Sequence, residues 1–310
     1  MFISILLIFI SHTVLAKGLN FGLVAKSTDD ANFISVWRGC NEAAKSSGDK
    51  CTLLGPKGSA QLRLQEAVVL SAVKNPQFDA LEISVISSKF VARALKNIQI
   101  PVITFDSPFN KRYEYLSNAY VGIDNITFGK YLAKIAKQLL PEGGTVCFMS
   151  AIHDPNLARR ILGARIEFSA NNKLTSSARL NGKWTETSRC PWDTSDNHAR
   201  SLAQLEYTLK NIEPDVFISV GHWPITDRLA YIKVVKPFRE NIISYKTLII
   251  VGIGNQSRED VDSLMSNGLI HGFVSIDFTE LGRKVYLTMK KLAEGKVINA
   301  ANWEDVIDSV

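Results

Sequence analysis

The stretch that decides the fold is YVGIDNITFGKYLAKIAKQLLPEGGTVCFMS, residues 120–150. It opens with an apolar segment, Tyr120–Ile123, that predicts a β-strand. A helix is expected at Phe128–Leu140, and it ends at Pro141-Glu142-Gly143-Gly144 because proline and glycine interrupt helices. The apolar segment Thr145–Ser150 then predicts a second strand. A strand, a helix and a strand in this order are typical of parallel strands whose connecting helix covers the sheet.

The same alternation extends in both directions from this unit. On its N-terminal side, strands are expected at Leu19–Ala25, Thr52–Leu54, Ala80–Ile83 and Pro101–Thr104, and helices at 33–44, Gln61–Val73 and Phe90–Leu95. On its C-terminal side, strands are expected at Ser177–Leu180, Val216–Val220, Thr247–Val251 and Gly272–Ser275, and helices at Asn156–Ala170, Ala199–Asn211, Ile225–Val235, Arg258–Ser266 and Glu280–Ala293. The pattern predicts the α/β class, with two doubly wound parallel-sheet lobes that meet near residue 123.

The composition excludes several classes of protein. The 310 residues are 46% hydrophobic and 21% charged, which is typical of a globular chain and excludes disorder and a multi-span membrane protein. Lys and Arg number 36 and Asp and Glu number 30, so the formal net charge is +6. No stretch concentrates the positive charge into a basic stripe, so nucleic acid is not an expected partner.

The N-terminus is typical of a signal peptide. Phe2–Ile10 is apolar and uncharged, and Val14-Leu15-Ala16 suits cleavage by a signal peptidase. A run of this length is too short to span a bilayer, which takes roughly 20 residues. We predict a signal peptide at 1–16, cleaved after Ala16, and a periplasmic mature protein. The alternative is a buried first strand.

The four cysteines predict disulfide bonds. An even number of cysteines in an exported chain is typical of disulfides, and Cys40, Cys51, Cys147 and Cys190 allow three pairings. The pairs Cys40–Cys51 and Cys147–Cys190 are preferred because each stays inside one expected lobe. Zinc is the alternative, but no C-x2-C spacing and no nearby histidine supports it, so no metal is expected.

Polar and aromatic residues gather directly after the expected strands. In open α/β sheets a ligand binds beyond the carboxyl ends of the strands. Carboxylates, amides and arginine can bind sugar hydroxyls, and aromatic rings can stack on the C–H faces of a sugar. The sequence therefore favours a small polyhydroxylated solute. The residues concerned are Asp29, Asp30, Asn32, Asp106, Asp124, Asn125, Asp154, Arg159, Arg160, Trp223 and Asn255. His153 and His222 are interpreted as polar loop residues.

Four segments, taken together in their order and spacing, carry a family resemblance. They are Asp30-Ala31-Asn32-Phe33, Ile100-Pro101-Val102-Ile103-Thr104-Phe105-Asp106, Val121-Gly122-Ile123-Asp124-Asn125 and Arg160-Ile161-Leu162-Gly163. Over essentially the whole mature chain, the sequence resembles the type I periplasmic solute-binding proteins of the ribose/galactose-type sugar-binding branch. The resemblance implies two lobes joined by a three-strand hinge, with crossings near Ile123–Asp124, Ser275–Asp277 and Asn299–Asn302. The implied lobes are 17–123 plus 277–300 and 124–276 plus 301–310.

The resemblance also implies roles for individual residues. Asp106 would accept hydrogen bonds from sugar hydroxyls, Arg160 would donate to the sugar, and Phe33 would stack on its ring. The rest of the implied ligand set is Asp30, Asn32, Trp192, Trp223, Asn255 and Asp277. Structural alternatives are a helix cap for Asp106, core packing for Phe33 and Trp223, and Arg159 as the ligand in place of Arg160.

The function implied is solute capture for an ABC-type permease, by a monomer with no cofactor and no catalytic residues. The alternative is a ligand sensor that signals to a membrane histidine kinase. A dinucleotide site is disfavoured because Gly252-Ile253-Gly254 lacks the third glycine, with Ser257 in its place. A repressor of the lactose type is disfavoured because no helix-turn-helix is visible ahead of the first strand.

Overall fold

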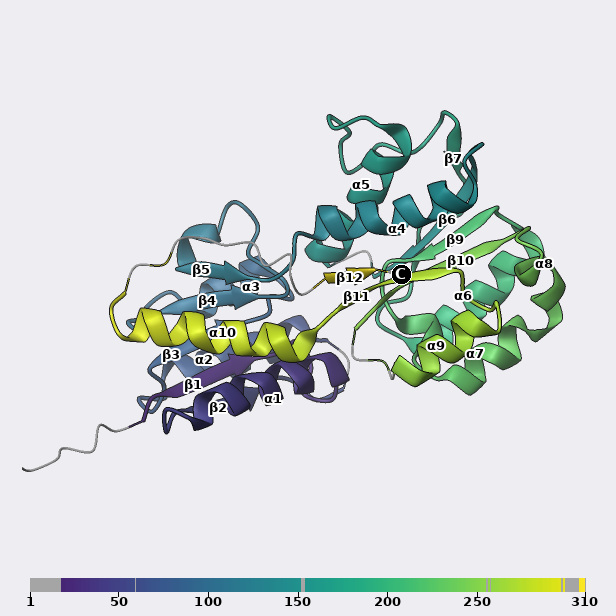
Figure 1. Cartoon of the computed structure of the whole chain (residues 1–310). Helices are drawn as coiled ribbons and strands as arrows, with labels where there is room; N and C mark the ends of the chain where they lie inside the picture. Colours follow the sequence, from purple (N-terminus) through teal and green to yellow (C-terminus); the bar gives the residue numbers. More distant parts are fainter. Residues whose placement is uncertain are drawn as a thin grey trace, which may run out of the picture.

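The computed structural model describes residues 18–58, 60–151, 154–254, 256, 258–296, 298 and 307–309. Two α/β lobes lie side by side (Figure 1), and each contains its own sheet of mainly parallel strands with helices packed around it. The predicted fold class is therefore confirmed. The predicted signal peptide, 1–16, lies outside the described residues.

The first lobe is built on a five-stranded parallel sheet in the order β2-β1-β3-β4-β5. Its strands are β1 (Asn20–Val24), β2 (Lys50–Leu54), β3 (Ala80–Ile83), β4 (Val102–Phe105) and β5 (Ala119–Val121). Its helices are α1 (Ala31–Lys45), α2 (Leu62–Val73), α3 (Ser88–Ala94), the 3-10 helix η1 (Glu114–Leu116) and α10 (Phe278–Ala293). Alternate residues of β1 face two apolar layers, because Phe21 and Leu23 pack with α1 and α10 while Val24 packs with α2 and α3.

The second lobe is built on a seven-stranded sheet in the order β12-β11-β10-β9-β6-β7, with β8 also paired to β6. Its strands are β6 (Gly144–Ser150), β7 (Trp184–Glu186), β8 (Trp192–Asp193), β9 (Val216–Ser219), β10 (Leu248–Ile253), β11 (Gly272–Ile276) and β12 (Ile307–Ser309), of which only β12 runs antiparallel to its neighbour. Its helices are α4 (Asn125–Leu139), α5 (Pro155–Ser169), α6 (His198–Asn211), α7 (Arg228–Val235), α8 (Arg239–Ile243) and α9 (Arg258–Ser266), with 3-10 helices η2 (Trp223–Ile225) and η3 (Lys236–Phe238). Every residue of β10 is buried, as expected for a strand covered on both faces.

The chain passes between the lobes at β5–α4 and returns at β11–α10 (Figure 1). These passages fall at the first two predicted crossings. The third predicted crossing, Asn299–Asn302, lies outside the described residues. The lobe boundaries at 123/124 and 276/277 stay a prediction.

Two predicted elements of the second lobe are wrong in detail. Ser177–Leu180 forms no strand, and β7 and β8 take the place beside β6. This segment is tied down by side chains instead, because Arg165 donates to the Ser176 carbonyl and the Leu180 backbone donates to Glu186. The helix predicted at Ile225–Val235 is split, since η2 ends at Ile225 and Asp227 caps the start of α7.

The preferred disulfide pairing is confirmed. Cys40–Cys51 joins α1 to β2, and Cys147–Cys190 joins β6 to the segment that leads into β8. The Cα atoms are 6.0 and 5.2 Å apart, within the usual range for a disulfide. Each disulfide therefore connects two segments of the same lobe.

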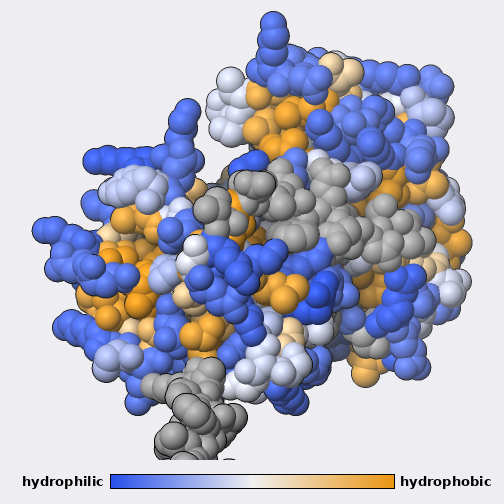
Figure 2. All heavy atoms as spheres, turned by 60° about the vertical axis from the view of Figure 1, so that its left-hand side comes forward, coloured by the Kyte–Doolittle hydropathy of each residue, from blue (hydrophilic) through white to orange (hydrophobic). Residues whose placement is uncertain are grey.

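The surface is mainly hydrophilic, as expected for a chain in which 21% of the residues are charged. The face in Figure 2 carries mainly hydrophilic side chains, with apolar atoms showing between them. Among the described helices, none combines the length and apolar character that crossing a bilayer requires.

Close helix packing depends on glycine at the contact between α4 and α5. A Cβ added at Gly129 would lie 1.8 Å from the carbonyl oxygen of Arg160, and one at Gly163 would lie 2.0 Å from the carbonyl oxygen of Ile126. These neighbours are backbone atoms, so they cannot move aside without separating the helices. The two helices therefore require glycine at both positions.

Gly163→Ala is expected to lower the free energy of unfolding by about 1–3 kcal/mol, because overpacking outweighs the helix-propensity gain of roughly 0.5–1 kcal/mol. Urea unfolding measures the change. Gly182→Ala is the matched control, because a Cβ there meets nothing within 4 Å. Equal stability of the two variants would contradict the close contact.

Glu82 is a carboxyl group buried in the first lobe. It lies on β3, is 0% exposed, and its Oε1 is 3.6 Å from Cys40 Sγ. Its Oε2 has no hydrogen-bond partner within the described part of the chain. Burial raises the pKa of Glu82 well above its ordinary value, because a carboxylate there would be charged and poorly solvated.

Glu82→Gln keeps the shape of the protonated acid and removes its titration. The folded state holds this proton more tightly than the unfolded state, so wild-type stability falls as the pH rises above the ordinary carboxyl pKa, by up to about 1.4 kcal/mol per pH unit. We expect the variant to be more stable than the wild type at pH 7 and to differ less at pH 4. Urea unfolding at both values tests this, and a gain that does not change with pH would contradict it.

Candidate functional site

A cavity of about 640 Å³ lies between the lobes. It is lined by segments that follow β1, β4, β6, β9 and β10, together with the first residues of α1 and α10. The parallel strands of both sheets point their carboxyl ends at this cavity, which is the place that the α/β fold provides for a ligand.

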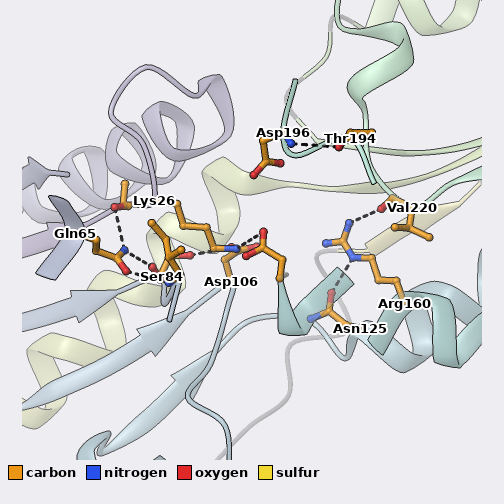
Figure 3. A network of polar contacts seen from close by, with 12 residues as sticks. Lys26, Gln65, Ser84, Asp106, Asn125, Arg160, Thr194, Asp196 and Val220 are labelled. Carbon is orange, nitrogen blue, oxygen red and sulfur yellow. Dashed lines mark hydrogen bonds and ion pairs between the residues drawn. The ribbon is translucent and has the colours of Figure 1, made fainter. Parts of the chain in front are cut away.

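Lys26 joins the two sides of the cavity. It follows β1 and lies beside Asp106 (Figure 3). Its Nζ lies 3.3 Å from Asp106 Oδ2 in the first lobe and 3.3 Å from Asp154 Oδ2 in the second. Burial opposes its charge, but the carboxylates of Asp154, Asp106 and Asp196 outweigh burial and raise the pKa of Lys26. Lys26 is therefore a permanent ammonium at the centre of an acidic cluster.

Gln65 fixes the segment that carries Lys26. This fully buried side chain on α2 donates from Nε2 to the carbonyl oxygens of Ala25, at 3.3 Å, and Ser84, at 2.7 Å (Figure 3). Its Oε1 accepts from the backbone N–H of Ile86 at 3.0 Å. The ends of β1 and β3 are thereby held together beneath the cavity floor.

Asp106 is held in a position that costs backbone energy. Its φ is +55°, in the left-handed region that L-residues avoid at about 1–2 kcal/mol. Ser84 Oγ donates to its carboxylate at 2.9 Å, and the Tyr120 hydroxyl donates to its carbonyl oxygen at 3.0 Å. Such strain is typical of functional sites, because surrounding contacts must impose it.

Arg160 is a buried donor on α5. Its Nε donates to Asn125 Oδ1 at 2.8 Å, its Nη1 donates to the Val220 carbonyl at 2.8 Å, and its guanidinium lies 4.1 Å from the ring centre of Phe128 (Figure 3). Burial lowers the pKa of Arg160 to about 10, with the Asp106 carboxylate opposing, so the group stays charged at neutral pH. These contacts leave Nη2 to donate to a molecule in the cavity.

Aromatic rings form apolar walls. Phe33 lines the cavity from α1 and packs edge-on against Phe105, and Trp223 lines it from η2. Trp223 Nε1 donates to Asp196 Oδ1 at 3.0 Å. Phe278, at the start of α10, adds a third ring. The cavity therefore combines apolar faces with charged donors and acceptors.

The structure brings most of the predicted site residues together. Those that line the cavity are Asp30, Asn32, Phe33, Asp106, Arg160 and Trp223. Trp192 is not among them, because its Nε1 donates to Thr208 at 2.8 Å and its ring packs on Tyr207. Asp277 caps α10 by accepting from the Glu280 backbone at 2.9 Å and does not line the cavity. Asn255 and His153 lie outside the described residues.

Other lining residues were not in the ligand set that the resemblance implied. Lys26 and Asp154 stand directly after strands, and Asp154 was among the polar strand-end residues that the sequence pointed to. Asp196 lies in the long connection before α6 and His198 is the first residue of α6, where no periodicity marks a site. His222 also lines the cavity, and burial lowers its pKa, so its imidazole is neutral at neutral pH.

One cluster in the described residues has the spacing of metal ligands: Cys40, Cys51 and Glu82. Both sulfur atoms belong to the Cys40–Cys51 disulfide, so they offer no thiolate to a metal ion.

Lys26→Met is expected to lower the free energy of unfolding by about 3–5 kcal/mol, because Asp106 and Asp154 are left buried without their cation. The carboxylates then hold protons more tightly in the folded state than in the unfolded state. The loss should therefore be largest at neutral pH and shrink as the pH falls toward 4.

Urea unfolding across pH 4–8 measures this loss. Lys111→Met, an exposed control, should change stability by less than about 0.5 kcal/mol. A loss for Lys26→Met no larger than that of the control would contradict the bridging role of Lys26.

Solved structures share this architecture. The chain is similar to GanP, a glucose-galactose binding protein from Geobacillus stearothermophilus, with a TM-score of 0.76 and 18% identity over 95% of this chain and 97% of GanP. It is similar to an ABC transporter solute-binding protein from Agrobacterium vitis solved with D-fucose, with a TM-score of 0.77 and 18% identity over 94% of each chain. It is also similar to a chain of the XylFII-LytSN complex, with a TM-score of 0.68 and 18% identity over 94% of this chain and 97% of that one.

At this level of identity the likeness establishes the fold. A search of curated protein sequences finds no significant match. The sequence model of one family, described as periplasmic binding protein domain, matches residues 21–297 and so covers both lobes. The chain therefore belongs to the periplasmic binding protein family.

Proposed function

We propose that this protein captures a small polar solute, a sugar, between its lobes and delivers it to an ABC-type permease. The observation that carries the proposal is the pairing of Asp106 and Arg160 with the rings of Phe33 and Trp223 around one cavity. Charged groups of both kinds hydrogen-bond to hydroxyls, and the rings cover the apolar C–H faces of a sugar. A cavity of about 640 Å³ suits a small ligand.

Asp106, Arg160 and the aromatic walls can supply the binding free energy that a sugar receptor requires. A micromolar receptor needs about 8 kcal/mol of binding free energy. Hydrogen bonds to charged groups contribute about 1.5–3 kcal/mol each, and Asp106 and Arg160 can each make more than one. Contact with the aromatic walls adds to this.

Binding from both sides would close the lobes. Lys26 and Asp106 follow strands of the first lobe, whereas Asp154, Arg160 and Trp223 belong to the second lobe. A solute that touches both sets has higher affinity for the closed arrangement and so shifts the population toward it. The passages at β5–α4 and β11–α10 would serve as the hinge between the proposed lobes, 17–123 plus 277–300 and 124–276 plus 301–310.

The family is extracytoplasmic, and the proposed route of export is a signal peptide cleaved after Ala16. Support for a sugar comes from the solved relatives, since one is a glucose-galactose binding protein and another was solved with D-fucose. A second candidate is a sensor that reports the solute to a membrane kinase. The similarity to a chain of the XylFII-LytSN complex favours this candidate.

The site is tested with purified mature protein and a panel of pentoses and hexoses, by thermal shift and titration calorimetry. At least one sugar should raise the melting temperature without being converted. Asp106→Asn and Arg160→Lys should each weaken its binding by at least about tenfold, because each removes charge-assisted hydrogen bonds.

Arg159→Met is the matched control, because Arg159 is an exposed neighbour of Arg160 that pairs with Asp124 outside this cavity. Circular dichroism checks that every variant is folded. Wild-type affinity in both site variants would refute the site, and the absence of binding by any sugar would refute the function.

A further inference from the structure

The cavity holds more carboxylates than cations. The acidic lining residues are Asp29, Asp30, Asp106, Asp154, Asp196 and Asp260, and the basic ones are Lys26 and Arg160. Lys26 already forms ion pairs with Asp106 and Asp154, and Arg228 forms one with Asp260 at 2.6 Å. The excess negative charge therefore falls on the remaining acids.

Three lining carboxylates have no cation among the described residues. Asp29 accepts from the Gly58 backbone N–H at 2.7 Å, and the other two are Asp30 and Asp196. Asp30 accepts from the Asn32 backbone at 2.8 Å, and Asp196 accepts from Trp223 Nε1 at 3.0 Å, so both partners are neutral. Within the described residues, no lysine, arginine or histidine nitrogen lies within 4.0 Å of either carboxylate.

These two carboxylates face the cavity from opposite lobes. Asp30 stands at the start of α1, and Asp196 stands in the connection before α6, with its carboxylate turned toward the Lys26 side of the cavity (Figure 3). Burial in the cleft raises the pKa of Asp196, Lys26 opposes this, and the charge of Asp30 raises it further. Both acids line one cavity, so their negative charges oppose each other.

Two further acceptors in the lining have no donor. His198 Nδ1 lies 2.7 Å from the Trp223 carbonyl, which can only accept, so this nitrogen carries the proton. His198 Nε2 is then a lone-pair acceptor, and it has no partner within the described residues. Asn156 is 3% exposed, lines the cavity, and its Oδ1 is buried without a partner in the same part of the chain.

Within the described residues, Asp30 and Asp196 lack a nearby cation that could donate several N–H bonds. Acceptors on Asp30, Asp196, His198 and Asn156 line the same cavity as the ring of Trp223, which also attracts cations. A primary ammonium supplies a positive charge and three donors together. A neutral hydroxyl would satisfy single acceptors but would leave the two carboxylates repelling each other.

We propose that the solute is a sugar that carries a protonated amino group, with the ammonium between Asp30 and Asp196 and hydroxyls toward Asp106 and Arg160. This inference rests on the proposed function and narrows its substrate class. The binding energy of the ammonium comes from neutralising carboxylates that the protein itself leaves without a cation.

The test compares three matched forms of each sugar by titration calorimetry on the mature protein at pH 7. They are D-glucosamine, D-glucose and N-acetyl-D-glucosamine, and the corresponding forms of D-galactose. At least one amino sugar should bind about tenfold or more tightly than its neutral parent, and N-acetylation should abolish the gain. Added salt should weaken binding of the amine more than binding of the neutral sugar.

Asp196→Asn and Asp30→Asn keep side-chain shape, and asparagine keeps the helix cap at Asp30. Each should reduce the ratio of amine to neutral affinity by about tenfold. Asp262→Asn, an exposed acid outside the cavity lining, is the control and should leave the ratio unchanged.

The outcomes separate the two proposals. Neutral sugars that bind as tightly as the amines, or a ratio that the site variants do not change, would overturn this inference and leave the proposed function standing. Failure of every sugar to bind, neutral or aminated, would overturn the proposed function itself.

Discussion

The ammonium of Lys26, placed between carboxylates of the two lobes, is the interaction on which the cleft depends. Without it, Asp106 and Asp154 would face each other as buried like charges, and two unit charges 4 Å apart repel by about 4 kcal/mol at an effective dielectric constant of 20. With it, acidic groups from both sheets can line one cavity while the lobes stay in contact. The site can therefore present carboxylates to a solute on both sides.

The positions of these groups follow from the parallel topology and from helix packing. Parallel strands end at the same edge of a sheet, so the residues after β1, β4, β6 and β9 converge without any special loop. The glycine contact between α4 and α5 places the Arg160 backbone against Gly129 and its guanidinium against Asn125. The same packing that stabilises the second lobe thus orients its main donor.

The carboxylates that line the cavity differ in their partners. Asp106 and Asp154 are balanced by Lys26, which suits neutral hydroxyls. Asp30 and Asp196 accept hydrogen bonds only from neutral donors, which leaves charge for the solute to neutralise. A receptor built this way can separate aminated from neutral sugars by electrostatics, while the aromatic walls of Phe33 and Trp223 accept the carbon skeleton of either.

The sequence by itself determined the α/β alternation, the place of Asp106 after a strand and the place of Arg160 in a helix, because periodicity and chain order report which face of an element is buried and which residues come after it. It favoured one cysteine pairing among the three that it allowed. It did not determine where Trp192 points, since packing against α6 directs that ring away from the cavity. Only the tertiary structure decided that Asp196 and His198 line the same cavity as Phe278, which is far along the chain. Their meeting depends on how two lobes close, and no local pattern encodes a distance between segments that distant in sequence.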